Sequence, residues 1–329
     1  MILTRAPLRV ALGGGGTDLP SYYAKHGGFV LSAAIDKYVY VCVNRPASDE
    51  LIRVKYSRSE EVATVRELEH DLVRPALELL DISGNIEIAS MADVPAGTGL
   101  GSSSSYLVAL LAALHELKRH RVPPHALAEL AVHVEMDLAG HPVGKQDQYL
   151  ASFGGVTCLE IEPDGTVHVS PARISLSTLE ELQSRLMLFF TGISRQANVI
   201  LDEQRRDSKN GNRDVLDSLH ATKELGLRIR SMLEEGDLDD FGRLMHEHWE
   251  NKKRRSSRIS DSSVDRWYEL ARSAGALGGK VVGAGGGGFL MLYCQNGSKQ
   301  AVRDALTADG LREMPFGFDF EGAKVLVNF

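Results

Sequence analysis

The stretch from Pro95 to Ser105 is rich in glycine and serine, and its composition and spacing suit the binding of phosphate. Residues 86–89 before it alternate apolar and polar side chains, as a strand does, and the leucines from Leu107 to Leu117 fall on one face of a helix. A glycine-rich loop therefore leads from a strand into a helix. Its glycines let the backbone approach a ligand, and the helix start favours an anion. Four serines add hydroxyls for phosphate oxygens or a metal, so the expected ligand is a nucleotide phosphate.

Two familiar phosphate-binding patterns do not account for this chain. The P-loop pattern needs a lysine after its second glycine, and no lysine lies between Lys55 and Lys118. The dinucleotide pattern G-x-G-x-x-G occurs at Gly283, Gly285 and Gly288, where it should open a helix. It is followed instead by the apolar run 289–294, which is typical of a buried strand. Both interpretations are therefore disfavoured.

Two carboxylates farther along the chain could serve a phosphate site. Glu135 lies beside the apolar stripe of a predicted helix, where a carboxylate needs a partner or a metal unless its head reaches water. Asp147 lies three residues past Gly144, at the predicted start of a short helix, where it could also merely complement the helix dipole. His141 has no second His or Cys at metal-binding spacing, so we expect a surface or loop histidine.

Another glycine-rich turn lies near the N-terminus. A strand predicted over residues 7–12 ends at Gly13–Gly16, with Arg9 and Asp18 flanking the turn. Such a loop can pass tightly over a ligand, but a plain hairpin turn with a solvated arginine explains the isolated segment equally well. A third such loop, 283–288, lies between two predicted strands. Ordering glycine-rich loops is costly in backbone entropy, so their presence indicates that the backbone closely approaches another group.

The remaining chain alternates strand-like and helix-like patterns, without internal repeats or low-complexity segments. Strands are expected at 30–34, 38–43, 51–54, 86–89, 153–161, 166–169, 186–190, 280–282, 289–294, near 315–320 and at 323–328. Helices are expected at 65–80, 176–184, 195–206, 213–234, 238–251, 263–273 and 298–308, besides those after the phosphate loop, after Pro124 and at Asp147. The basic run 252–255 is interpreted as a solvated face.

Length and charge limit the possible classes of protein. A chain of 329 residues is long for one core, so we expect two domains. The net charge of −7 argues against a nucleic-acid or anionic-membrane partner, and a polyanionic substrate would need local positive groups. The three cysteines are interpreted as core thiols in a reducing cytosol, and no apolar run is long enough for a membrane span or a signal peptide. We therefore expect a cytoplasmic protein, whose oligomeric state the sequence leaves open.

Three segments in order, 6–18, 95–105 and 280–289, resemble the three motifs of the GHMP kinase superfamily, named for galactokinase, homoserine kinase, mevalonate kinase and phosphomevalonate kinase. One such loop is a weak signal, whereas three in order are specific. The resemblance implies an α+β fold with an N-terminal α/β domain, a C-terminal ferredoxin-like domain and an active site between them. We place the two domains at 1–185 and 186–329.

The resemblance also implies a role for each matching position, with ATP and Mg²⁺ as cofactors. The ATP phosphates would be bound by Pro95, Gly97, Thr98, Gly99, Leu100, Gly101, Ser102, Ser103 and Ser104. Mg²⁺ would be held by the oxygens of Ser103 and Glu135. Asp147 would take the proton of the attacking hydroxyl, and Arg9 would stabilise charge on the reacting oxygens. The sugar would be bound by Gly16, Thr17 and Asp18, and the cleft wall would be shaped by Gly283, Gly285, Gly286 and Gly287.

Within the superfamily, the chain is most similar to the D-glycero-D-manno-heptose 7-phosphate kinases. The similarity lies in residues 4–9, 14–18, 144–149, 153–155 and 191–195. Galactokinases carry a Glu-His pair where this chain has Gly15 and Gly16, which argues against galactose. The implied reaction is ATP-dependent phosphorylation of the anomeric hydroxyl of a sugar phosphate. A kinase for an unphosphorylated sugar and a non-catalytic regulator that binds ATP and sugar remain alternatives.

A substrate that already carries a phosphate would need a cationic clamp, because the chain is acidic overall. The candidates are Lys145, Arg195, Lys252 and Lys253. Arg195 is placed first, because it follows a short predicted strand at the start of the second domain and its guanidinium suits phosphate.

Overall fold

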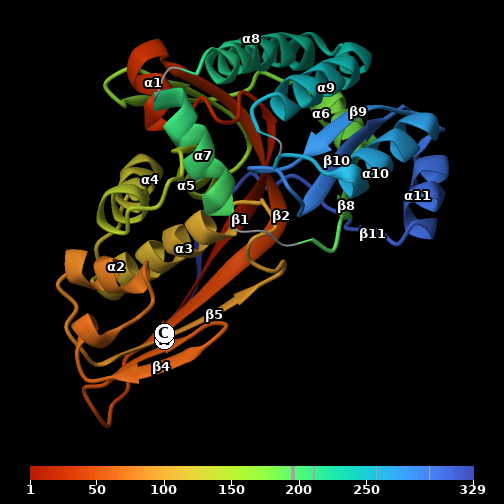
Figure 1. The fold of residues 1–329 in the computed structure, drawn as a ribbon. Coiled ribbons are helices and arrows are strands. Elements are labelled where there is room, and N and C mark those ends of the chain that lie inside the picture. Colours follow the sequence, from red (N-terminus) through yellow and green to blue (C-terminus); the bar gives the residue numbers. More distant parts are fainter. Residues whose placement is uncertain (194–196, 210–211, 257, 296) are drawn as a thin grey trace.

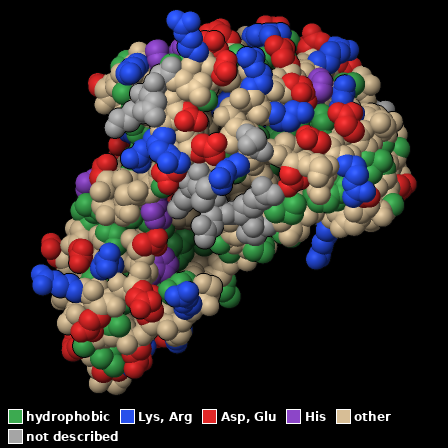
Figure 2. Space-filling view, viewed as in Figure 1, with side chains coloured by type: hydrophobic (Ala, Val, Ile, Leu, Met, Phe, Trp, Pro, Cys, Tyr) green, Lys and Arg blue, Asp and Glu red, His purple; other side chains and the backbone are tan. Residues whose placement is uncertain are grey.

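The computed structural model describes residues 1–329 apart from 194–196, 210–211, 257 and 296. The described strands form two sheets, one of eight strands and one of four, with helices packed around both (Figure 1). None of the described helices has the length and apolar character that crossing a membrane requires. On the face drawn in Figure 2, acidic and basic side chains are interspersed, so that face carries no extended patch of one charge.

The larger sheet is built on two long antiparallel strands, β1 (Ile2–Gly13) and β2 (Gly28–Asn44). From Ala6 onward β1 is fully buried, because helices pack on it as well as its neighbouring strands. The two halves of β2 pair with different strands, β6 along 28–33 and β5 along 39–44. The other strands of this sheet are β3 (Ile52–Lys55), β4 (Ser59–Val62), β5 (Ile86–Ala92), β6 (Val156–Ile161), β7 (Val167–Pro171) and β12 (Lys324–Asn328).

One helix, α3, lies against the centre of the larger sheet and among other helices, and it is buried from Ser104 to His115. That burial follows from its sequence, which is apolar on nearly every side after the serines. The described helices are α1 (Pro20–His26), α2 (Val73–Leu79), α3 (Ser102–Leu117), α4 (Pro124–Val132), α5 (Gln146–Phe153), α6 (Leu176–Arg185), α7 (Ala197–Lys209), α8 (Arg213–Glu235), α9 (Leu238–Lys253), α10 (Ser262–Ser273) and α11 (Lys299–Ala308), with a 3₁₀ turn η1 (Val65–Glu67) and a π-helical segment η2 (His133–Leu138).

The smaller sheet has the strand order β11–β8–β10–β9 and is antiparallel throughout. Its strands are β8 (Leu186–Phe190), β9 (Ala276–Val281), β10 (Phe289–Cys294) and β11 (Arg312–Glu313). Numbered along the chain, the order is 4-1-3-2, with helices after the first and third strands, as in ferredoxin-like folds. Its core includes Phe189, Trp249 and Tyr268. The two-domain α+β fold is thus confirmed.

Several predicted elements differ from the structure. The helix expected over 65–80 is the short turn η1 followed by α2, and the two strands expected within 30–43 are one strand, β2, whose pairing with β1 passes a register shift. Residues 315–320 form no continuous strand: Phe318 makes a single bridge to Ile35, and the edge strand is β11 instead. Cys158 and Cys294 are buried as predicted, whereas Cys42 is partly exposed.

The smaller sheet begins with β8 at Leu186, next to the proposed division at 185/186, but the later chain also returns to the larger sheet. The last strand, β12, pairs antiparallel with β1, and Figure 1 places the C-terminus beside the larger sheet. Residues 324–328 therefore complete the sheet that the N-terminus begins. Helix α8 also packs on β1 and β2, so the two halves share one core.

Candidate active site

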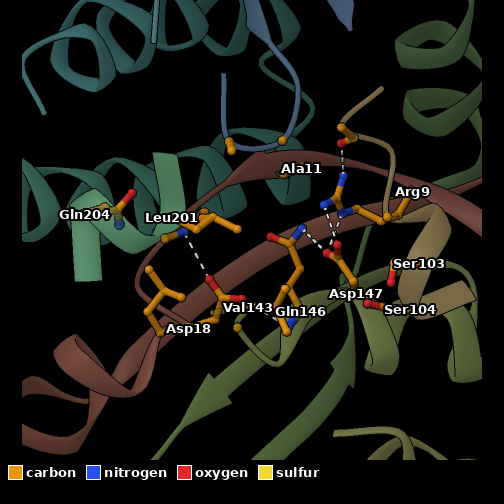
Figure 3. A pocket seen from close by; sticks show the side chains of 18 of the residues that line it. Arg9, Ala11, Asp18, Ser103, Ser104, Val143, Gln146, Asp147, Leu201 and Gln204 are labelled. Atoms are coloured by element: carbon orange, nitrogen blue, oxygen red, sulfur yellow. Dashed lines mark hydrogen bonds and ion pairs between the residues drawn. The ribbon is translucent and has the colours of Figure 1, made fainter. Parts of the chain in front are cut away.

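A cavity of about 660 Å³ lies where the end of β1, the phosphate loop, helix α5 and helix α9 meet. Its volume is in the range of small-molecule sites. Figure 3 shows Ser103 and Ser104 at one end of the cavity, Gln204 and Leu201 at the other, and Arg9, Gln146 and Asp147 between them. The cavity therefore has a phosphate-loop end and an opposite end at Gln204 and Leu201, which we call the acceptor end because we propose that the phosphate acceptor binds there.

Six of the nine predicted nucleotide-binding residues line the cavity: Gly97, Gly99, Gly101, Ser102, Ser103 and Ser104. Pro95, Thr98 and Leu100 shape the loop instead. The hydroxyl of Thr98 donates to the carbonyl of Pro95 over 3.0 Å, and Leu100 is buried while its carbonyl accepts the N–H of Arg9. Helix α3 begins at Ser102, so its free N–H groups face the cavity end, as the sequence predicted.

The phosphate loop 95–105 and the glycine-rich loop 283–288 touch each other. Gly99 has a φ of +81°, and a Cβ added there would lie 2.6 Å from the carbonyl oxygen of Val282, while one added to Gly283 would lie 2.6 Å from Gly99. Both positions therefore require glycine. Gly283 lines the cavity, whereas Gly285, Gly286 and Gly287 pack against Ile259 and Ile193 behind it.

Arg9 and Asp147 form a two-pronged ion pair at the centre of the cavity. Arg9 Nε donates to Asp147 Oδ1 and Nη2 donates to Oδ2, each over 2.7 Å. Arg9 Nη1 also donates to the carbonyl of Gly99 over 2.5 Å, and Gln146 Nε2 donates to Asp147 Oδ1 over 3.1 Å. The carboxylate is 24% exposed, so a substrate hydroxyl can reach it. A Cβ added to Gly101 would lie 3.1 Å from Asp147 Oδ2, which places the carboxylate against the phosphate loop.

Glu135 lies fully buried beside the start of α3. Ser103 Oγ donates to its Oε1 over 2.8 Å, Ser104 Oγ donates to Oε2 over 2.7 Å, and Gln148 Nε2 donates to Oε2 over 2.8 Å. The π-helical segment η2, which the sequence pattern did not predict, carries Glu135 and continues α4. Such π-helical turns are frequent at functional sites. The structure thus brings Ser103 and Glu135 together, as the resemblance implied.

His141 lies in a loop, as the sequence predicted, and its ring is paired rather than free. Its Nε2 lies 2.9 Å from Asp71 Oδ2, and its Nδ1 lies 3.7 Å from Glu135 Oε1. Hydrogen bonds to these two carboxylates raise the pKa of His141 to about 9, so the ring is protonated at neutral pH. The positive ring therefore balances the buried charge of Glu135. Asp71 is 70 residues away in sequence, and no local pattern pointed to it.

Asp18 lies at the acceptor end. Its Oδ1 accepts the N–H of Gly16 over 3.0 Å, and its Oδ2 accepts the N–H of Gln146 over 3.1 Å. Burial raises the pKa of this carboxyl group above its ordinary value. Thr17 does not line the cavity: its hydroxyl donates to the carbonyls of Gly14 and Phe29 and fixes the turn. Gly16 and Asp18 do line it.

The basic residues differ most from the sequence interpretation. Lys145 points away from the cavity, because its Nζ pairs with Glu129 Oε1 over 3.1 Å and donates to the carbonyl of Gly165 over 2.7 Å. Arg195 lies outside the described residues. Lys253 pairs with Glu250 over 2.8 Å at the surface.

Half of the basic run 252–255 is buried, so its interpretation as a solvated face is wrong for those residues. Lys252 and Arg255 line the cavity and are 8% and 4% exposed, while Arg254 is exposed. The sequence did indicate which of these residues are buried: positions 241, 245, 248, 252 and 255, along α9 and into the following turn, are spaced three or four residues apart and so share one face. Lys280 is a further buried lysine at the cavity; from the sequence it was expected to begin a strand and the third glycine-rich motif.

Comparisons with known proteins agree with this geometry. The family model of the GHMP kinases N terminal domain matches residues 62–155, and that of the GHMP kinases C terminal region matches residues 229–311. A D-glycero-alpha-D-manno-heptose 7-phosphate kinase from Campylobacter jejuni is 30% identical, with 98% of each chain covered. An L-fucokinase/L-fucose-1-P guanylyltransferase from Bacteroides fragilis is 28% identical over 91% of this chain and 35% of its own length.

The chain belongs to the GHMP kinase family and is a sugar kinase of that family. Among solved structures, a D-glycero-D-manno-heptose 1-phosphate kinase from Bacteroides thetaiotaomicron superposes with a TM-score of 0.83 at 28% identity, with 100% of both chains covered. Lactococcus lactis galactokinase in complex with galactose shares the fold, with a TM-score of 0.76 at 19% identity over 99% of this chain and 95% of that one. Members of this family use ATP as phosphate donor.

Proposed function

We propose that the protein transfers the terminal phosphoryl group of ATP to the anomeric hydroxyl of D-glycero-D-manno-heptose 7-phosphate, giving the 1,7-bisphosphate. The observation that carries the proposal is the Arg9–Asp147 pair, which lies between the phosphate loop and the acceptor end of the cavity. A sugar hydroxyl placed there meets a carboxylate and a phosphoryl donor at once. The similarity to heptose phosphate kinases supports the choice of sugar.

Each side chain at the centre has a definite task in this reaction. Asp147 accepts the proton of the sugar hydroxyl while the hydroxyl oxygen attacks phosphorus. An anomeric hydroxyl is more acidic than an ordinary alcohol, so a carboxylate suffices as base. Arg9 holds both carboxylate oxygens in place, and its positive charge stabilises the charge that builds on the reacting oxygens. Asp18 accepts hydrogen bonds from sugar hydroxyls at the acceptor end.

The residues at the phosphate-loop end fit a magnesium ion. Ser103 and Glu135 present oxygen ligands side by side, and Mg²⁺ prefers a few protein oxygens together with waters and nucleotide phosphates. The described residues contain no cluster of three or more His, Cys, Asp or Glu that could hold a metal, so the phosphates would supply the remaining ligands. When bound, the ion would neutralise charge on the ATP phosphates.

Replacing Glu135 by Gln should raise the Mg²⁺ concentration needed for half-maximal activity by about tenfold, because the carboxylate that accepts the Ser103 hydroxyl loses its charge. The serine hydroxyls and Gln148 can still hydrogen-bond an amide, so the fold is expected to persist. The measurement is activity against Mg²⁺ concentration, with Mn²⁺ binding in the presence of ATP as a second readout. An unchanged metal requirement would give Glu135 a purely structural role.

The choice of sugar is tested by measuring ADP release with a panel of acceptors. We expect heptose 7-phosphate to be used with a kcat/KM at least about 100-fold above that of unphosphorylated heptose, fucose or galactose, since a buried charged contact is worth that much. Heptose 1-phosphate belongs in the panel because its anomeric position is blocked. Equal use of the free sugar would favour the fucokinase-like alternative, and turnover of heptose 1-phosphate would contradict the anomeric acceptor. ATP and sugar binding without ADP release would favour a regulator.

A further inference from the structure

We propose that the phosphate at the far end of the sugar substrate is received by Arg255, with Gln204 beside it, in the positive field of Lys252 and Lys280. This inference rests on the proposed function for the identity of the substrate. Of the clamp candidates that the sequence offered, Lys252 is kept, Lys145 and Lys253 are engaged elsewhere, and Arg195 lies outside the described residues. The four residues come from α7, from α9 and the turn that follows it, and from β9, and all of them line the same cavity.

Arg255 is buried and forms no ion pair in the described part of the chain; burial lowers its pKa to about 10, while the charge of Asp18 acts in the opposite direction. Its Nε donates to Ser218 Oγ over 3.1 Å, its Nη1 donates to the carbonyl of Gly15 over 3.1 Å, and its Nη2 donates to Thr222 Oγ1. These partners are neutral oxygens that fix the plane of the guanidinium group. Three of its five N–H donors are used, so two remain for a ligand. A guanidinium group held in this way is suited to a phosphate.

Gln204 supplies a second free donor at the same place. Its side chain is 6% exposed, and its Nε2 has no hydrogen-bond partner among the described residues. A Cβ added to Gly16 would lie 2.8 Å from Arg255 Nη1 and 2.8 Å from Gln204 Nε2, so both groups border the turn that carries Asp18. A buried amide nitrogen without a partner is costly, which indicates that a ligand completes its hydrogen bonding.

Two buried lysines, Lys252 and Lys280, also line the cavity, and neither forms an ion pair with a carboxylate of the described chain. Lys252 Nζ donates to the carbonyls of Val281 and Gly283, and Lys280 Nζ donates to that of Leu12, so each retains unused donors. Burial and the neighbouring cations lower the pKa of Lys252 to about 7 and also lower that of Lys280. A dianion bound among these groups would favour the protonated forms of both lysines, whose positive charge would then add to that of Arg255.

The position of Arg255 favours the substrate phosphate over the ATP phosphates. Gln204, its neighbour across Gly16, lies at the end of the cavity opposite Ser103 and Ser104 (Figure 3). The reacting centre, Asp147, lies between the two ends. In a heptose 7-phosphate, the phosphate is at the opposite end of the carbon chain from the anomeric hydroxyl. A sugar with its anomeric hydroxyl at Asp147 and Asp18 along its side therefore directs its phosphate toward Arg255.

The test compares Arg255→Gln with the matched control Arg254→Gln, which removes the same charge from an exposed neighbour. In Arg255→Gln we expect the KM for heptose 7-phosphate to rise by about 100-fold, while the KM for ATP and the kcat/KM for unphosphorylated heptose change by less than about threefold. The preference for the phosphorylated sugar should collapse. Because Arg255 also makes structural hydrogen bonds, Gln204→Leu serves as a second variant, and its KM for heptose 7-phosphate should rise by about tenfold.

A direct binding measurement distinguishes failure of the proposed phosphate clamp from failure of the proposed reaction. Heptose 7-phosphate is titrated calorimetrically into the wild-type protein and into both variants without ATP, so that no turnover is needed. If the wild type binds heptose 7-phosphate and Arg255→Gln and Gln204→Leu bind it more weakly, the clamp is supported. A lack of turnover in that case overturns only the proposed reaction. Equal binding by all three proteins overturns the clamp alone. An equal loss of kcat/KM for the free sugar and its 7-phosphate also overturns it, because the cations would then act on ATP.

Discussion

Replacing Asp147 by Asn should lower kcat at saturating ATP and sugar phosphate by about 10²- to 10⁴-fold, the usual loss when a general base is removed. The amide cannot accept a proton from the sugar hydroxyl. It also sets an NH₂ group against an arginine that donates to both carboxylate oxygens. The loop 95–105, to which we assign the ATP phosphates, is held by hydrogen bonds that this carboxylate does not make, so the dissociation constant for ATP should stay nearly unchanged.

The measurement is steady-state turnover with a separate ATP-binding titration. Asp164→Asn is the matched control, because Asp164 is an exposed turn residue whose carboxylate accepts only local hydrogen bonds from Thr166. The control should turn over at the wild-type rate. If Asp147→Asn turned over at nearly the wild-type rate, the hydroxyl proton would be leaving by another route, and Asp147 would only position the substrate.

The parts of the site that local sequence could predict are those made by contiguous residues. The loop 95–105 is one, because its glycines and the helix start act together within a few residues. Glu135 is another, since a carboxylate next to an apolar helical stripe must find a partner. The placement of both follows from rules of helix periodicity and helix termini. Their chemical roles came from the family resemblance instead.

The parts that could not be predicted depend on contacts between distant elements. The partner of His141 is Asp71, and Arg255 is fixed by Ser218, Thr222 and Gly15. The residue types within 252–255 do not distinguish the buried cations from the exposed ones. The spacing of the buried positions along α9 distinguishes them only when it is followed beyond the last apolar residue. Strand β12 is a similar case, because a strand's own pattern does not reveal which edge it will join.

Replacing Arg9 by Met should lower kcat by about 10³-fold, in the range found when an arginine that stabilises phosphoryl transfer is removed. The loss combines two effects: the positive charge beside the reacting oxygens disappears, and Asp147 loses two of its three hydrogen bonds. Arg9→Lys should recover only part of the rate, since an ammonium group keeps the charge but cannot bind both carboxylate oxygens in a fixed plane. Steady-state kinetics of the two variants measures how the loss in kcat divides between the lost positive charge and the lost hydrogen bonds to Asp147.

The double variant Arg9→Met/Asp147→Asn tests whether the two residues act as one unit. Because Arg9 acts partly by positioning Asp147, the combined loss in kcat should be much smaller than the product of the single losses. Fully multiplicative losses would mean that the ion pair between them contributes nothing to turnover. Arg9 is nearly buried and holds the carbonyl of Gly99 as well, so the thermal unfolding of each variant must be compared with that of the wild type. A loss of turnover with an unchanged unfolding temperature assigns the effect to chemistry, because the fold that positions Asp147 is then intact.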